Sequence, residues 1–378
     1  MLNLNAQSLA VLSTLALSSY LLPQSYCAEM TVYAIGVGQG DSNIIACPNG
    51  RDILIVDMGA TRPIYVDKSY GTYLLKEKFG AVKKGVNIHI IVSHSHIDHY
   101  SFITSALDEE LAPLVSEVVL GGIYENYGKS FKKWLSTIIG NVYSVNNEQS
   151  CFGNSDCTWT PVYAIRDSAA NETSLESKKR DPWQVCGKEV DITVLGANIG
   201  TTPNSRSVIL KIVYNKWSLF LGGDFEGVTA QKQLWENWSN ATLQSTYYKI
   251  SHHGAWTDFK ANHPALLARV KPQRVYVSQG YPEISQFRHP NCEAIQHLQD
   301  IGTLDHINAN VNNPFVCWSG DTNSGHSVIK QGFGLAIYET CRKYDKRTKT
   351  QTCQDIMIQT DGKRDHTQYV DIPEQFVR

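Results

Sequence analysis

The first 28 residues contain no lysine, arginine, aspartate or glutamate. Their leucine-rich stretches are interrupted by serine and threonine, so they fall short of the ~20 apolar residues that a membrane-spanning helix needs. A short apolar core followed by Ser-Tyr-Cys-Ala at residues 25–28 is typical of a cleaved secretory signal peptide. We therefore expect residues 1–27 to be a signal peptide, the mature protein to be secreted, and no stable insertion into a membrane.

The chain also lacks an excess of either charge, because its formal net charge is −2 at pH 7. Dedicated nucleic-acid-binding proteins usually carry a strongly basic surface, so the net charge does not support a nucleic-acid partner, although a local basic groove stays open. The sequence contains no phosphate-binding loop, internal repeat or low-complexity tract. Hydrophobic residues make up 42% of it, which is enough for the core of one large domain. Nothing in it indicates an oligomeric state.

The cysteines are present in a number that suits disulfide bonds. Nine occur in the chain, and loss of Cys27 with the signal peptide leaves eight, an even number that fits four bridges in a secreted protein. Local spacing suggests that Cys151 pairs with Cys157 and that Cys341 pairs with Cys353, and the other pairings stay open. Three glycosylation sequons agree with a secretory route. They begin at Asn171, Asn237 and Asn240.

Three histidines and a carboxylate gather within six residues, in the segment His-Ser-His-Ile-Asp-His at 94–99. This segment follows the apolar run 86–92, which predicts a buried strand, so the polar side chains come where the chain leaves a sheet and can converge. The first two histidines could point toward one ion, and the carboxylate and last histidine toward a second. Imidazole and carboxylate ligands without thiolate suit zinc or manganese. The candidate ligands are His94, His96, Asp98 and His99.

Two further carboxylates follow predicted strands. A strand over residues 51–57 ends in Asp57, which could accept a hydrogen bond from a ligand histidine or could simply cap a turn. A predicted hairpin over residues 208–224 ends in Asp224, after two glycines that would let the backbone approach a metal closely. The carboxylate of Asp224 could bridge two ions.

A third group of candidate ligands follows the strand predicted over residues 247–251. His252 and His253 are adjacent there and are followed by glycine. Because neighbouring side chains on an extended chain point to opposite sides, we expect one of the pair to bind metal and the other to face substrate. Which of the two binds the metal stays open.

The order of these motifs resembles the metallo-β-lactamase superfamily and, more narrowly, its ComEC-like branch. The motifs span roughly residues 32–300 and read Gly-Gln-Gly-Asp-Ser, Ile-Val-Asp-Met-Gly, His-Ser-His-Ile-Asp-His, Asn-Ser-Arg-Ser-Val, Leu-Gly-Gly-Asp, His-His-Gly and Arg-His-Pro. The resemblance implies an α/β fold, a four-layer αβ/βα sandwich, with two divalent metal ions at its rim. Zinc is the expected metal and manganese the alternative.

Changes in composition and strand pattern along the chain predict a domain organisation. We expect one hydrolase domain over residues 28–330, with a polar surface insertion over 141–188. We expect residues 331–378 to form a C-terminal extension packed on the same domain. The extension should contain a β-hairpin of residues 333–339 against 353–359.

Carried over to this sequence, the resemblance assigns a role to each motif residue. His94 and His96 match the ligands of the first metal, and Asp224 matches the bridging carboxylate. The ligands of the second metal match Asp98, His99 and one of the pair His252 and His253. His289 matches the histidine of a Gly-His-Pro motif, although Arg288 stands where glycine is usual. The candidates for contacts behind the ligands or to substrate are Asp41, Asp57, Asn204, Ser205 and Arg206.

One histidine that many members of the superfamily possess is absent. They place a further ligand of the first metal between the opening motif and the bridging aspartate, but this chain has no histidine between His99 and His252. The ComEC-like branch tends to have asparagine and serine in that region, as Asn204 and Ser205 do. We therefore expect the first metal to have fewer protein ligands, to bind more weakly, or to be completed by water or by a substrate phosphate.

Two ions ~3.5 to 4 Å apart can lower the pKa of a bound water to ~7, orient it and neutralise a leaving oxygen. The sequence thus predicts a secreted dinuclear-metal-dependent hydrolase, with Asp98, His253 and His289 as catalytic residues. Family analogy favours phosphodiesters, in nucleic acid or a phosphorylated headgroup. A carboxylic ester or lactone hydrolase is the alternative, and a non-catalytic secreted binding protein is a third.

Overall fold

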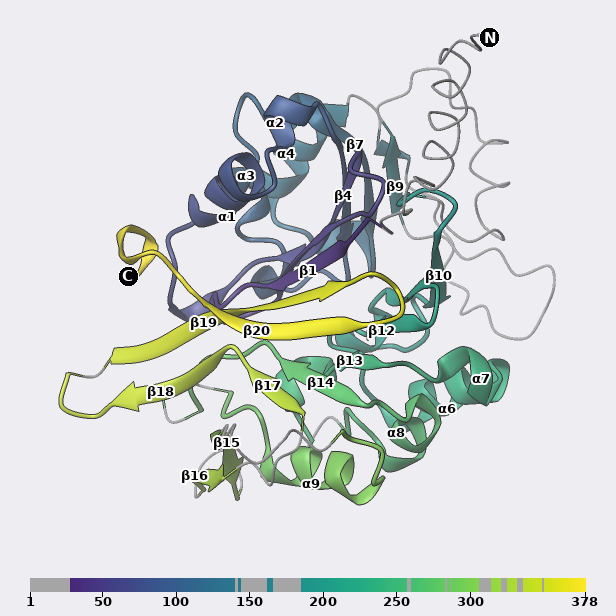
Figure 1. The fold of residues 1–378 in the computed structure, drawn as a ribbon, viewed down its shortest axis with the longest axis vertical. Coiled ribbons are helices and arrows are strands. Elements are labelled where there is room, and N and C mark those ends of the chain that lie inside the picture. Colours follow the sequence, from purple (N-terminus) through teal and green to yellow (C-terminus); the bar gives the residue numbers. More distant parts are fainter. Residues whose placement is uncertain are drawn as a thin grey trace, which may run out of the picture.

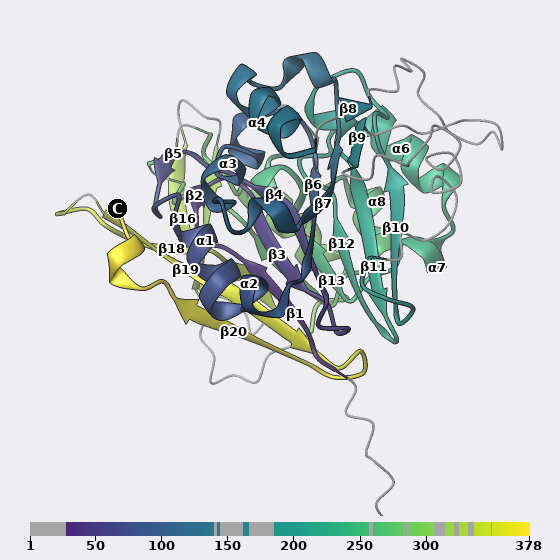
Figure 2. The same ribbon diagram turned by 90° about the horizontal axis from the view of Figure 1, so that it is seen from above.

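The computed structural model describes residues 28–139, 142–143, 162–165, 185–256, 260–282, 284–285, 287–305, 314–320, 325–331, 336–348 and 350–378. The predicted signal peptide, most of the predicted insertion, Cys151, Cys157 and the sequon at Asn171 lie outside these residues. Within them, two sheets pack face to face and helices cover the outer face of each (Figures 1 and 2). This confirms the α/β fold class, a four-layer αβ/βα sandwich.

The first sheet has the strand order β18-β19-β1-β3-β4-β6-β7-β9-β8, and β20 pairs with β19. Because β4, β6 and β7 run parallel, their carboxyl ends lie at one edge of the sheet. The short ribbon β2–β5 (Gly38–Gln39 and Thr61–Ile64) is separate. The strands of the sheet are β1 (Met30–Ala34), β3 (Ser42–Ala46), β4 (Asp52–Met58), β6 (Asn87–Val92), β7 (Val115–Leu120), β8 (Val142–Tyr143), β9 (Val162–Ile165), β18 (Cys341–Asp345), β19 (Thr350–Thr360) and β20 (Asp365–Asp371).

The second sheet has the order β10-β11-β12-β13-β14-β17, in which the last four strands are parallel. A two-stranded hairpin, β15–β16, stands apart from both sheets. The strands are β10 (Val190–Gly196), β11 (Ile209–Tyr214), β12 (Trp217–Leu221), β13 (Tyr247–Lys249), β14 (Arg274–Val277), β15 (Pro314–Ser319), β16 (His326–Gln331) and β17 (Ile337–Glu339).

The helices form the two outer layers of the sandwich. Those on the first sheet are α1 (Tyr70–Tyr73), which continues into a π-helical turn at Leu74–Lys78, α2 (Ala81–Lys84), α3 (Ile103–Ala106) and α4 (Lys129–Ile139). Those on the second sheet are α6 (Val228–Asn237), α7 (Asn240–Leu243), α8 (Pro264–Val270) and α9 (Cys292–Asp300).

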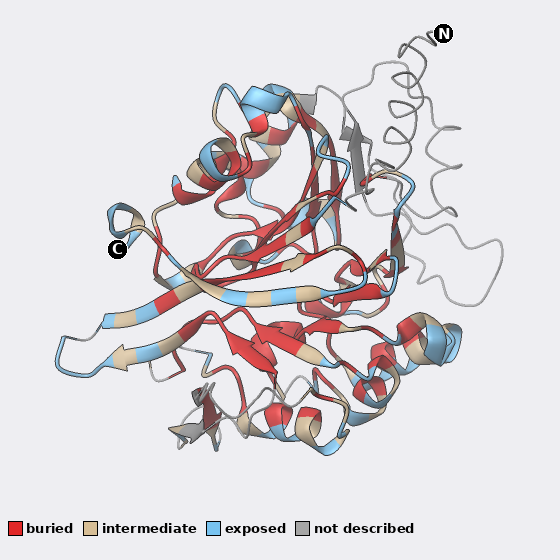
Figure 3. Ribbon diagram, in the orientation of Figure 1, coloured by how far each residue is buried: buried red, intermediate tan, exposed pale blue. Residues whose placement is uncertain are grey.

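Alternation of side chains along the strands explains how three cores hold four layers together. On β4, Ile53 and Ile55 pack against the first helical layer, whereas Leu54 and Val56 pack between the sheets. On β12, Phe220 instead faces the second helical layer. The buried residues accordingly follow the strands and the inner sides of the helices (Figure 3). The loops at the sheet edges therefore follow strands whose side chains are well packed.

The C-terminal segment belongs to both sheets, which corrects the predicted hairpin of residues 333–339 against 353–359. Strand β17 pairs with β14 in the second sheet, whereas β19 pairs with β1, β18 and β20 in the first. The hairpins of this segment are β18–β19 and β19–β20. Different partners are favoured because Ile337 of β17 packs under the second helical layer, whereas Ile356 and Ile358 of β19 pack between the sheets.

Three disulfides join described residues, and one of them was predicted. Cys341 pairs with Cys353, as expected, and the two lie opposite each other on β18 and β19. Such bonds are typical of proteins that fold in an oxidising compartment. Among the described helices, none has the length and apolar character needed to cross a membrane. The other two bonds are Cys47–Cys186 and Cys292–Cys317.

Asp355, on β19, makes part of the stability depend on pH. It is buried, and its carboxylate accepts hydrogen bonds from the Gly36 amide at 2.9 Å and the Tyr70 hydroxyl at 2.6 Å. Burial raises the pKa of Asp355 from 3.8 to about 7, and these bonds and the charge of Lys78 offset it only in part. The native state thus keeps a proton that the unfolded chain releases above pH 3.8, so this contribution is complete below that pH and is lost as the pH rises toward 7.

We expect the free energy of unfolding of the wild type, relative to that of Asp355→Asn, to fall between about pH 4 and pH 7 and to stay constant above, since an amide has no proton to lose. Urea titrations at successive pH values measure this difference. Asp191→Asn, at an exposed carboxylate of β10, is the control and should show no such trend. A difference for Asp355→Asn that does not vary with pH would contradict the assignment.

Candidate metal centre

The predicted ligands gather where parallel strands of the two sheets end. The segment 94–99 follows β6, Asp224 follows β12, and His252 and His253 follow β13. Since carboxyl ends of parallel strands share an edge and the sheets pack face to face, these segments meet. The structure thereby joins side chains that are more than a hundred residues apart in the sequence.

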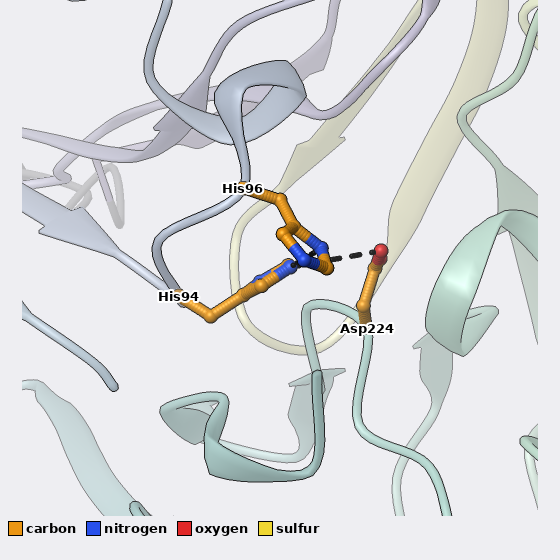
Figure 4. Close-up of side chains that lie close together, drawn as sticks. All are labelled: His94, His96 and Asp224. Atoms are coloured by element: carbon orange, nitrogen blue, oxygen red, sulfur yellow. Dashed lines mark hydrogen bonds and ion pairs between the residues drawn. The ribbon is translucent and has the colours of Figure 1, made fainter. Parts of the chain in front are cut away.

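His94, His96 and Asp224 form the first group of potential ligands (Figure 4). Nε2 of His94 lies 3.0 Å from Nδ1 of His96 and 3.9 Å from Oδ2 of Asp224. Nδ1 of the buried His94 lies 3.1 Å from the Ser93 hydroxyl and 3.4 Å from the Ser207 hydroxyl, which fix the ring from behind. His96 is exposed, so the cluster meets solvent on this side.

Asp98, His99 and His253 form the second group. Nε2 of His253 lies 3.5 Å from Oδ2 of Asp98 and 3.6 Å from Oδ2 of Asp224. Nε2 of His99 lies 3.2 Å from the same oxygen of Asp224. Asp224 therefore borders both groups.

The second nitrogen of each buried histidine in this group has an oxygen acceptor behind it. Nδ1 of His99 lies 2.9 Å from Oδ2 of Asp57, whose Oδ1 accepts from the Ser93 amide at 2.6 Å. Nδ1 of His253 lies 2.7 Å from the Ser278 carbonyl. A proton on Nδ1 leaves the lone pair on Nε2, so these contacts turn both Nε2 atoms toward the cluster as ligand atoms.

A buried ion pair lies behind the histidines, and the sequence pattern did not reveal it. Lys249, at the end of β13, donates to the carboxylate of Asp41 and, at 3.1 Å, to the Gly223 carbonyl. Asp41 lies 3.8 Å from Nδ1 of His99 and 3.6 Å from Nδ1 of His253. The carboxylate of Asp41 is thus on the far side of these rings. A lysine in the run Tyr-Tyr-Lys gives no hint of a partner 208 positions earlier.

A glycine brings the Asp224 loop against the first sheet. Gly223 has a φ of +52°, and a Cβ atom there would lie 2.5 Å from Cβ of Ser93. Any side chain would therefore push the loop away from the residue that precedes His94. This close approach explains one of the two glycines before Asp224.

The charges of the cluster hold protons on some histidines and not on others. Burial by itself lowers the pKa of His99, but the charges of Asp224 and Asp57 outweigh it and hold that pKa well above its usual value. Burial and the charge of His99 hold the pKa of His94 well below its usual value. Burial raises the pKa of Asp224, but the histidines, His99 and His253 foremost, hold it well below its usual value. A bound cation would take over the role of these protons and release them.

His252 and His253 both face the cluster, because they do not continue the extended strand that the sequence pattern predicts. With φ values of +50° and +51°, both lie in the left-handed region instead of on an extended strand. Nε2 of His252 lies 3.8 Å from Oδ2 of Asp224, close to the 3.6 Å of His253. The two histidines differ in the group that Nδ1 faces. Nδ1 of His252 lies 2.8 Å from Oε2 of Glu226, whereas Nδ1 of His253 lies 2.7 Å from the Ser278 carbonyl.

The segment that begins with Asn204 reaches the cluster only in part. Nδ2 of Asn204 donates to Oε2 of Glu226 at 3.1 Å, so Asn204 touches the cluster through Glu226. Ser205 bonds to Thr202, and Nε of Arg206 donates to a backbone carbonyl, at Gly200. Glu226, Ser207 and Lys249 were not among the predicted site residues.

His289 lies beside the histidine pair. Its ring centroid is 5.4 Å from that of His252 and 6.5 Å from that of His253. Burial and the positive charges of these two rings hold the pKa of His289 well below its usual value. His289 thus contributes a neutral imidazole to the edge of the cluster.

Two buried nitrogens show that the cluster fits a cation. Within the described part of the chain, Nε2 of His99 and Nε2 of His253 have no hydrogen-bond partner. Buried polar atoms are rarely left in this state, and a metal ion would satisfy both. The donors are imidazole and carboxylate without thiolate, the set that zinc and manganese accept. The residues present therefore fit a divalent metal.

Two solved structures are similar to this chain. Igni18, described as a novel metallo hydrolase from the hyperthermophilic archaeon Ignicoccus hospitalis, is 12% identical, with a TM-score of 0.38 over 80% of this chain and 99% of that one. A mutant of the CmlA beta-hydroxylase is 10% identical, with a TM-score of 0.41 over 80% of this chain and 54% of that one. No family model matches the sequence, and no curated protein matches it.

Proposed function

We propose that this protein is a secreted metal-dependent hydrolase with two divalent ions. The observation that carries the proposal is the position of Oδ2 of Asp224, which has Nε2 of His94, His99 and His253 within 3.9 Å. One carboxylate oxygen between two groups of histidines suits a bridging ligand. Secretion is supported by the charge-free N-terminal segment and by the disulfides.

The first ion would be held by His94, His96 and Asp224, and the second by Asp98, His99, His253 and Asp224. When bound, such ions supply Lewis acidity and an activated water. The protein's own contribution is orientation, because Asp57 and the Ser278 carbonyl fix the rings of His99 and His253. The Ser207 hydroxyl lies 3.4 Å from Nδ1 of His94 and helps to fix that ring.

The substrate we favour is a phosphodiester, because the motif order resembles the ComEC-like branch. An exposed apolar side chain lies within the segment that carries the ligands. Ile97, between His96 and Asp98, is 59% exposed. A phosphorylated headgroup attached to an apolar moiety suits this side chain better than a polyanion does. The same side chain favours, as the second candidate, a carboxylic ester with an apolar acyl chain.

Chelation should abolish hydrolysis, and zinc or manganese should restore it. We expect the restored protein to cleave bis-p-nitrophenyl phosphate faster than p-nitrophenyl butyrate, and to contain two ions per chain by elemental analysis. Cleavage of the carboxylic ester alone would favour the second candidate. Less than one ion per chain, with none regained on addition, would favour a non-catalytic binding protein.

A pair of exposed histidines supplies a matched control for this experiment. His96→Gln should lose the first ion, because it removes one of only three ligands. His366→Gln, on β20, should retain both ions and full activity, because His366 is exposed on a strand outside the cluster. Equal metal content of the two variants would contradict the proposed ligand set.

A further inference from the structure

A cavity of about 360 Å³ lies at the edge of the second sheet that is opposite the metal centre. Residues at the start of β12, β13 and β14 form its walls, together with part of the turn 361–364 between β19 and β20. The metal ligands instead follow the carboxyl ends of β12 and β13, and the five residues of β12 separate the two places by roughly 15 Å. The cavity is therefore a separate site, and a ligand in it would not cover the metal centre.

Basic side chains dominate the lining of this cavity. Four of its eight lining residues are basic and one is acidic. Lys216 and Lys363 are exposed, and no group in the described part of the chain pairs with either ammonium group. Arg364 pairs with Asp361 at 3.4 Å, but its side chain is 90% exposed, and such exposed pairs contribute little. The charges of these three basic residues are thus available to a ligand.

A backbone contact brings the two lysines to the same cavity. Lys216 lies on the turn between β11 and β12, in the second sheet, and Lys363 on the turn between β19 and β20, in the first (Figures 1 and 2). The Gly362 carbonyl accepts from the amides of Lys216 at 2.8 Å and Trp217 at 3.2 Å. Gly362 has a φ of +80°, and a Cβ atom there would lie 2.8 Å from the Tyr214 carbonyl oxygen, so the contact requires glycine. Like charges held at one cavity repel each other, and a bound anion would remove that repulsion.

One wall of the cavity is fixed and keeps a free acceptor. Arg274 donates to Oδ1 of Asp365, and its Nε lies 3.1 Å from Oδ2 of Asp305. Two carboxylates thus compensate the charge of Arg274, so this residue shapes the wall and does not attract an anion. The Tyr247 hydroxyl also donates to Oδ1 of Asp365, at 3.0 Å. Oδ2 of Asp365 has no donor among the described residues, so it can accept a hydrogen bond from a ligand.

Trp217 adds a polar group without a partner to the lining. It is 3% exposed, and its Nε1 has no hydrogen-bond partner in the part of the chain that the structure describes. Buried donors are rarely left in this state, and a bound water or ion is one of the few explanations. This donor points to a ligand independently of the lysines.

We propose that this cavity binds one sugar or cyclitol ring that carries two or more phosphate or sulfate esters. Ammonium and guanidinium groups donate charge-assisted hydrogen bonds to such esters. The ring hydroxyls would donate to Oδ2 of Asp365 and accept from the exposed amide of Gln273. A bare anion has no hydroxyl for that carboxylate. A volume of about 360 Å³ is at the lower end of the range for ligand cavities, which suits a single ring.

Isothermal titration calorimetry of the metal-loaded protein tests the proposal without turnover. The probes are a bisphosphate and a bissulfate of the same ring, myo-inositol. We expect Lys216→Gln/Lys363→Gln to weaken binding by about 100-fold, because each charge-assisted hydrogen bond contributes about tenfold or more. Phosphate bound at the metal centre would titrate as a second site that this variant does not change.

A second double variant is the matched control. Lys129→Gln/Lys133→Gln removes the same charge at two exposed positions of α4, on the outer face of the first sheet. It should change the affinity by less than about twofold, because salt screens distant charges. Equal weakening by the two double variants would contradict the proposal, since net charge alone would then attract the ring.

The remaining outcomes concern the ligand. The ester that binds more tightly identifies phosphate or sulfate as the group that the cavity recognises. No binding of either ring would overturn the proposal. Inorganic sulfate that binds as tightly as the rings would do the same, because the cavity would then hold an adventitious ion only. The result does not depend on the hydrolase function, since binding at this cavity is measured whether or not the protein cleaves any ester.

Discussion

Replacing Asp224 by asparagine should lower hydrolysis by on the order of 10³-fold and should reduce the bound metal. Asparagine keeps the shape of the side chain but removes the charge that faces His94, His99 and His253. Metal ions contribute several kcal/mol of transition-state stabilisation. Since about 1.4 kcal/mol corresponds to a tenfold change in rate, loss of the shared ligand accounts for this size of effect. Steady-state kinetics and elemental analysis measure the two quantities.

The control is Asp191→Asn, which makes the same chemical change at an exposed position of β10. It should retain both activity and metal. Calorimetric titration of the metal-free Asp224→Asn protein should also show weakened binding at both sites, because the carboxylate borders both ligand groups. If only one affinity changes, Asp224 is a ligand of one ion and not a bridge.

The sequence predicted the parts of the site that are local in the chain. The strand before His94, the hairpin before Asp224 and the strand before His252 each have a hydrophobic pattern that indicates a strand and its end. Side chains at such ends converge once the strands are parallel neighbours. The four-layer sandwich was expected from the resemblance that the order of the motifs carries, and not from the strand patterns.

The parts that were missed depend on contacts between distant segments. The pattern of residues 337–339 predicts a strand, but alternation of side chains with a period of two does not determine which strand it pairs with. In the structure, β17 pairs within the second sheet and β19 within the first. The Lys249–Asp41 pair arises only after the two sheets meet. Glu226 follows Asp224 by two residues, yet its contact with His252 arises only from the left-handed turn at that histidine.

The conformation of His252 and His253 could not be read from the residues. Two adjacent histidines after a strand predict an extended path with side chains on opposite sides. The chain instead turns there, with the His252 amide bonded to the Gly223 carbonyl at 3.1 Å. This contact ties the histidine pair to the loop of Asp224. A bond between two loops that belong to different strands has no signature in either loop alone.

Replacing Lys249 by methionine should lower the free energy of unfolding by about 3–5 kcal/mol. Both Lys249 and Asp41 are almost fully buried, so removing the lysine leaves the Asp41 carboxylate without its main counter-charge. Breaking one half of a buried ion pair costs this much because the remaining charge is neither solvated nor paired. Urea denaturation of the metal-free protein isolates this effect from any change in metal binding.

The double variant Lys249→Met/Asp41→Asn separates the missing charge from the missing side chain. It should cost clearly less than the sum of the two single changes, because no unpaired charge is left behind. Lys211→Met provides a matched comparison, since Lys211 is also buried but its ammonium group donates to the carbonyls of Thr242 and Gln244 and not to a carboxylate. That change leaves no buried charge and should cost less than Lys249→Met. If the costs of the two single changes at Lys249 and Asp41 simply add, the pair does not act as a unit behind the histidines.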